Sequence, residues 1–240
     1  MAEEMIEEAA PWSRDPDGSV AVLSPDSPAL PRPRLRGVLH QIAFSASLVV
    51  GTLLIVGAEG ASRHAAAAVF AGSVAFCFGI SALYHRVTWT ARVRLWMRRL
   101  DHAGVYLLIA GTYTPVCLLV LGGAWRLGVL VTVCTGACVG IAAKFVWVDA
   151  PKWLAVALGI ALGWAAVVIL PQLATRLNPA AVVLLGLGGI AYTAGAIIYA
   201  RRRPDPVPAV FGYHELFHAL TIVAVACQYA AIAFFIIRAG

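Results

Sequence analysis

Residues 214–237 read HELFHALTIVAVACQYAAIAFFII, a run that is apolar except near its start. A helix needs about 20 apolar residues to cross the hydrocarbon core of a bilayer, so this run is long enough to span it. Its first turns nevertheless contain His214, Glu215 and His218. An ionisable side chain inside a membrane costs roughly several kcal/mol unless it has a partner, and such residues therefore point to a functional site.

The composition of the whole chain agrees with membrane insertion. Of 240 residues, 61% are hydrophobic and 12% are charged, against about 25% charged residues in soluble domains. The mean hydropathy is +0.83. These values predict a polytopic membrane protein and exclude a large soluble core. Because no basic stretch is interleaved with aromatic residues, we expect no nucleic-acid partner.

The apolar segments predict an all-α bundle of seven transmembrane helices. Thr114-Pro115 lies inside the third segment and should kink that helix rather than end it. Residues 1–36 are acidic and rich in Pro, Ser and Asp, which is typical of a disordered tail. We therefore divide the chain into a tail over 1–36 and a transmembrane domain over 37–240. The expected spans are 38–58, 65–86, 101–121, 126–147, 152–171, 180–200 and 214–237.

Basic residues in the connecting loops predict the orientation of the bundle. Thirteen basic residues lie on one side of the membrane and only four on the other, namely Arg63, Arg126, Arg176 and Arg238. The amino terminus is therefore expected in the cytoplasm and the carboxyl terminus outside. The thirteen basic residues on the cytoplasmic side are Arg32, Arg34, Arg36, Arg86, Arg92, Arg94, Arg98, Arg99, Lys144, Lys152, Arg201, Arg202 and Arg203.

This topology brings polar residues from three helices to one depth. His85 falls at the cytoplasmic end of the second span, Asp101 at the start of the third, and His214 and His218 in the first turns of the seventh. Residues four apart share a helix face, so His214 and His218 can bind one ion together. Ser81 shares a face with His85 one turn deeper.

Three histidines and a carboxylate are a natural ligand set for a catalytic zinc ion with one position left for water. We predict Zn²⁺ bound by His85, His214 and His218. Asp101 would hold the water and accept its proton, and Ser81 would bond a ligand, the water or a substrate carbonyl.

Each of these residues also has a simpler interpretation. His85 could be a hydrogen-bonded residue of a helix contact, Asp101 could pair with Arg98 or Arg99, and Ser81 could bond back to its own helix. Three other histidines are expected to have no part in the site. His40 and His64 lie at helix ends without partners of matching depth, and His102 points about 100° away from Asp101 around its helix.

Residues 214–218 also match H-E-x-x-H, the helix signature of zinc proteases. In that hypothesis Glu215 is the general base and the third ligand comes from elsewhere, such as Asp101. The third histidine at the same depth, His85, argues against it. Glu215 lies about 100° from the face shared by His214 and His218, which suits a supporting or interface role.

Four motifs together resemble the hemolysin III family and its relatives, the progestin and adipoQ receptors. They are residues 81–86 (SALYHR), 100–115 (LDHAGVYLLIAGTYTP), 188–195 (GGIAYTAG) and 211–218 (FGYHELFH). The resemblance covers about residues 37–237, and the short loops look like the bacterial branch, which implies the plasma membrane of a bacterial cell. It implies a seven-helix bundle with zinc on His85, His214 and His218, and with Asp101 and Ser81 beside it. Gln228-Tyr229 departs from the family pattern, which has a histidine before the aromatic residue.

The resemblance implies two alternative functions. The first is a zinc-dependent, ceramidase-like hydrolase of a lipid amide or ester that acts in membrane homeostasis, with membrane lipids as partners and an acyl lipid as substrate. The second is a non-enzymatic cytolytic, pore-forming or small-solute channel protein in which zinc is structural. The sequence has no repeated polar helix face of the kind that would line a wide channel.

Overall fold

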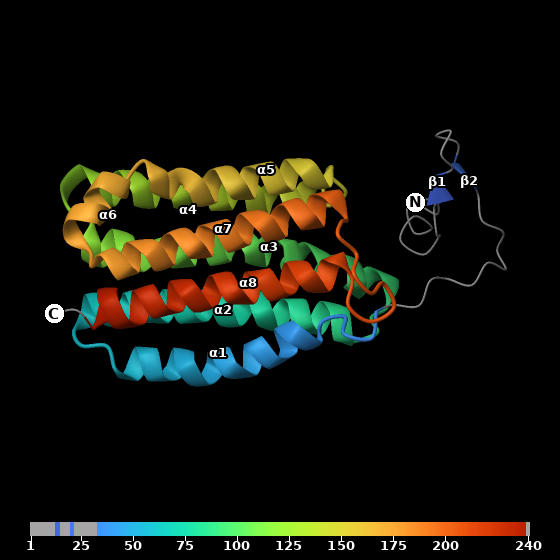
Figure 1. Ribbon diagram of the computed structural model, residues 1–240, viewed down its shortest axis with the longest axis horizontal. Coiled ribbons are helices and arrows are strands. Elements are labelled where there is room, and N and C mark those ends of the chain that lie inside the picture. Colours follow the sequence, from blue (N-terminus) through green and yellow to red (C-terminus); the bar gives the residue numbers. More distant parts are fainter. Residues whose placement is uncertain (1–12, 15–19, 22–32, 239–240) are drawn as a thin grey trace.

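The computed structural model describes residues 13–14, 20–21 and 33–238. Two short strands, β1 (Ser13–Arg14) and β2 (Val20–Ala21), pair antiparallel. The elements within residues 33–238 are helices, apart from an isolated β-bridge between Val207 and Phe211 (Figure 1). Most of the predicted tail over 1–36 lies outside the described residues, so its disorder stays a prediction.

Within the described part of the chain, six helices are long and apolar enough to cross a membrane. A bent pair of helices makes a seventh span if its two parts are counted as one. The prediction of an all-α membrane bundle is therefore confirmed, with six spans, or seven when the bent pair counts as one. The helices are α1 (Val38–Val56), α2 (Ala61–Arg86), α3 (Ala91–Pro115), α4 (Gly123–Val146), α5 (Lys152–Gly163), α6 (Leu170–Arg176), α7 (Pro179–Arg201) and α8 (Tyr213–Ala231).

The span predicted as one helix over 152–171 is broken. A 3-10 turn (Trp164–Val167) follows α5, and α6 leaves at an angle of 47°. Pro171 lacks the N–H that would continue the helix, and it suits the first turn of a new one. The Tyr113 hydroxyl of α3 donates to the Gly163 carbonyl at 2.7 Å, which stabilises the break.

The third helix begins ten residues earlier than expected, at Ala91 instead of residue 101. The arginines at 92–99 suggested a loop, but the segment also contains Leu95, Trp96 and Met97, and arginine is itself a good helix former. The chain continues past Pro115 as a π-helix (Val116–Val120), so the proline does not end the span, as predicted. A second π-helix (Ile232–Ile237) closes α8.

The buried interior of the bundle is more apolar toward one end than toward the other. Phe70, Cys117 and Ile232 belong to the buried apolar core, which lies toward the loops that join α1 to α2 and α3 to α4. The ends of the helices at the opposite end, where α1 and α8 begin and α2 ends (Figure 1), carry the buried polar residues His40, Ser81, Glu215 and His218. The same end contains most of the arginines, as expected from the loop charges.

Candidate metal centre

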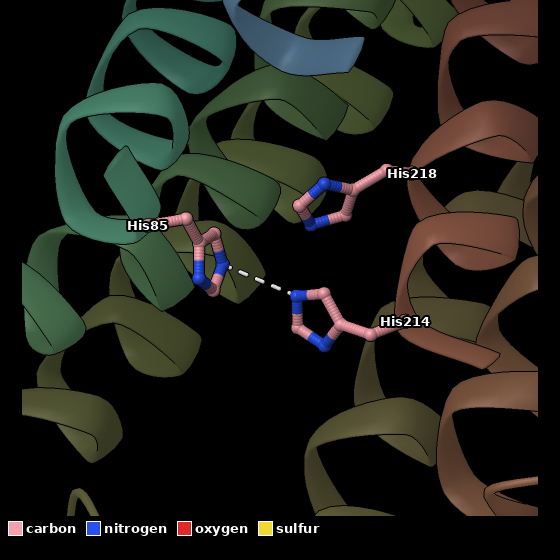
Figure 2. A group of neighbouring side chains, drawn as sticks. All are labelled: His85, His214 and His218. Atoms are coloured by element: carbon pink, nitrogen blue, oxygen red, sulfur yellow. Dashed lines mark hydrogen bonds between the residues drawn. The ribbon is translucent and has the colours of Figure 1, made fainter. Parts of the chain in front are cut away.

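Three histidines from two helices point toward one another near the arginine-rich end (Figure 2). His85 lies in the last turn of α2, and His214 and His218 lie in the first two turns of α8. The Nε2 atoms of His85 and His214 are 3.1 Å apart. With one ring nitrogen taken from each histidine, all three lie within 4.8 Å of one another. These residues could hold a metal ion.

The donor set fits a tetrahedral ion. Two nitrogens bound at about 2.0–2.1 Å in tetrahedral geometry are separated by about 3.3 Å, close to the 3.1 Å between His85 and His214. The nitrogen of the third histidine, His218, lies at most 4.8 Å from the other two nitrogens. It therefore needs to move by at most about 1.5 Å to reach the separation of about 3.3 Å. Within the described part of the chain, the buried Nδ1 of His218 has no hydrogen-bond partner.

Local structure explains why these side chains converge. The Glu215 carboxylate accepts the Gly212 N–H at 2.9 Å and so caps α8, which begins at Tyr213, one residue before His214. Gly37, just before α1, has a φ of +76°, and a Cβ at this position would lie 2.7 Å from the Cβ of His85. Only glycine therefore allows the start of α1 to approach His85 this closely.

Asp101 and Ser81, the two predicted catalytic residues, lie beside the histidines. The Oδ2 atom of Asp101 is 4.0 Å from the Nε2 of His85, and Ser81 is close enough to interact with the carboxyl group of Asp101. Of the two arginines considered as alternative partners of Asp101, Arg98 and Arg99, Arg98 donates to Asp149 at 2.6 Å. Their catalytic roles stay predictions.

The prediction that His40 has no partner at matching depth is wrong. Its ring stacks on that of His218, with 3.7 Å between centroids and 5° between planes. Its Nδ1 lies 2.8 Å from the hydroxyl of Ser81. The topology could have revealed this, because a helix that starts in the cytoplasm puts position 40 at the depth of His85. His64, by contrast, is exposed at the opposite end, and His102 is outside the group of three.

Glu215 has a structural environment that the sequence did not show. Its side chain is 1% exposed, and its Oε1 lies 2.6 Å from the Nε of Arg36. The backbone N–H groups of Arg34 and Leu35 donate to the carbonyls of Ala209 and Val210. Residues 34–36, which we assigned to the tail, therefore lie against the loop before α8. With its carboxylate in a helix cap and an ion pair, Glu215 is poorly suited to be the base of a protease.

Comparison with known proteins assigns this chain to a family. The family model described as "Haemolysin-III related" matches residues 29–229, which include all the residues above. The chain belongs to the haemolysin III family. It is 29% identical over 170 residues to the "Hemolysin-3 homolog" of Bacillus subtilis (strain 168), which covers 71% of this chain and 76% of that protein. It is 32% identical over 165 residues to "Hemolysin-3" of Bacillus cereus, covering 68% of this chain and 75% of that protein. This haemolysin III protein is thus a multi-pass membrane protein.

Proposed function

We propose that this haemolysin III protein is a zinc-dependent hydrolase that cleaves an amide or ester bond in a membrane lipid. The observation that supports it is the convergence of three imidazoles with a carboxylate 4.0 Å from one of them. Imidazole ligands favour zinc over magnesium or calcium, which prefer oxygen. His85, His214 and His218 would hold the ion. A bound zinc ion would polarise the substrate carbonyl and acidify a water molecule.

The side chains around the ion then divide the remaining work. The Asp101 carboxylate lies 4.0 Å from the Nε2 of His85, a separation that one water molecule can bridge. It is therefore suited to take a proton from the attacking water. It would return that proton to the leaving nitrogen or oxygen when the carbonyl carbon–heteroatom bond breaks. The hydroxyl of Ser81 would donate to the carbonyl oxygen as negative charge develops on it.

The depth of the site supports an acyl-lipid substrate. The histidines lie near the arginine-rich end, and loops rich in arginine stay in the cytoplasm. In the orientation that we propose, with the amino terminus inside, the site is in the inner leaflet of the bacterial plasma membrane. A lipid can reach such a position sideways between helices, with its acyl chain still in the bilayer.

The test compares Asp101→Asn with wild type, purified in lipid nanodiscs. We expect one zinc per chain in both and a fall of about 100-fold or more in fatty-acid release from ceramide or phospholipid for Asp101→Asn. Asp149→Asn is the control, since it removes an exposed carboxylate at the same end of the bundle. A wild-type rate in Asp101→Asn would refute the assignment.

A second function is a cytolytic or channel activity with structural zinc. Two observations favour it: the histidines tie α2 to α8, and the relatives are named hemolysin-3. The distinguishing experiment replaces His85, His214 and His218 together. Leakage from liposomes that contain this metal-free variant would favour the second function. Metal-dependent release of fatty acid by wild type would favour the hydrolase.

A further inference from the structure

We propose that His40 is a positioning residue that holds the His218 ring in place for the metal ion and holds Ser81 beside Asp101. The inference rests on the metal site of the proposed function. It brings in α1, a helix to which neither the sequence motifs nor the three-histidine group assigned a residue of the site.

The first contact is the ring stack. The rings of His40 and His218 are nearly parallel, 3.7 Å apart between centroids. The two residues are 3% and 2% exposed, so neither ring can turn outward without unpacking the helices. The ring of Phe78, in α2, also packs against the His40 ring, with 4.9 Å between their centroids, and restricts it further. The His218 plane is therefore held by its neighbour, and the orientation of a ligand ring affects metal affinity.

The second contact is polar. The Nδ1 of His40 and the hydroxyl of Ser81 form a hydrogen bond of 2.8 Å. A serine hydroxyl has one donor and two acceptor positions, so it can interact with His40 and with Asp101 together. The contacts then link His218, His40, Ser81, Asp101 and His85 around the centre. Four helices (α1, α2, α3 and α8) contribute to this ring of contacts.

His40 does not have the geometry of a fourth ligand. The metal-binding lone pair of an imidazole lies in the plane of its ring, and two stacked rings, nearly parallel with centroids 3.7 Å apart, do not converge on one ion. The buried Nε2 of His40 has no hydrogen-bond partner in the described part of the chain. Direct ligation is therefore the rival explanation that the experiment must separate.

Two substitutions separate the contacts. His40→Phe keeps a flat ring against His218 but loses the bond to Ser81. His40→Asn keeps a polar atom near the position of Nδ1 but loses the stack. Zinc affinity is measured by titrating metal-free protein against a chromophoric chelator. We expect His40→Phe to stay within about threefold of wild type and His40→Asn to bind at least about tenfold more weakly, since supporting residues cost about 10–100-fold when replaced.

His64→Asn is the matched control, because His64 is an exposed histidine at the other end of the bundle whose Nδ1 also has a nearby partner, the Gly60 carbonyl at 3.0 Å. Melting temperatures of the metal-free proteins distinguish an effect on the ligand from a loss of fold. Equal zinc affinity in His40→Phe and His40→Asn would overturn the stacking role. Loss of zinc in both variants, to the extent seen in His85→Ala, would make His40 a ligand and overturn it as well. Wild type without zinc would instead refute the proposed function and this inference with it.

Discussion

Replacing Gly37 by alanine tests how closely the metal centre depends on the start of α1. Gly37 has a φ of +76°, and an added Cβ would lie 2.7 Å from the Cβ of His85. Gly123, at the opposite end of the bundle, also has a positive φ of +55°, but an added Cβ there meets nothing within 4 Å. The two substitutions share the backbone strain and differ in the contact with His85.

The expected magnitudes follow from this difference. A left-handed conformation costs a residue with a Cβ about 1–2 kcal/mol, and both variants incur it. Ordinary carbon contacts begin at about 3.5 Å, so in Gly37→Ala the segment and His85 must separate by about 0.8 Å. Distances in a working metal site are held within about 0.2 Å, so a displacement of this size should weaken zinc binding by about tenfold or more.

Zinc content and zinc affinity of the purified proteins are the measurements, with melting temperature alongside. Gly123→Ala should melt slightly lower than wild type and bind zinc normally, whereas Gly37→Ala should lose affinity as well as stability. If the two variants had equal affinity for zinc, the contact between Gly37 and His85 would not be what positions that ligand.

The remaining predictions concern stability. Arg36→Gln leaves the buried Glu215 carboxylate without its cation and should lower the free energy of unfolding by about 3–5 kcal/mol. Glu215→Gln should lower it less, because the Arg36 side chain is 24% exposed. Melting temperatures that fall equally would contradict this order. Tyr113→Phe removes the donor to the Gly163 carbonyl and should lower the free energy of unfolding by about 1–3 kcal/mol, measured by thermal unfolding. The comparison variant is Tyr229→Phe, since the Tyr229 hydroxyl donates to the Val50 carbonyl. An unchanged melting temperature in Tyr113→Phe would show that the break after α5 needs no such bond.

Much of the fold follows from the sequence because a bilayer imposes a simple rule. Every backbone polar group inside it must be satisfied within the chain, so a long apolar run forms a helix. Six of the seven spans follow from that rule alone. The exceptions are local. Arginines after residue 91 suggested a loop where the helix continues, and the effect of Pro171 on the span before it depends on whether another helix offers a hydroxyl, as Tyr113 does.

The candidate site divides in the same way. Helical spacing and loop charge, which are local properties of the chain, were enough to bring His85, Asp101, His214 and His218 to one end of the bundle. Only the tertiary structure decided which other side chains meet them there. His40 stacks on His218, Glu215 pairs with Arg36, and Gly37 lies against His85 because α1 packs beside α2 and the segment before it rests on the loop before α8. Contacts of this kind depend on how helices pack laterally, and the periodicity of a single helix does not contain that information.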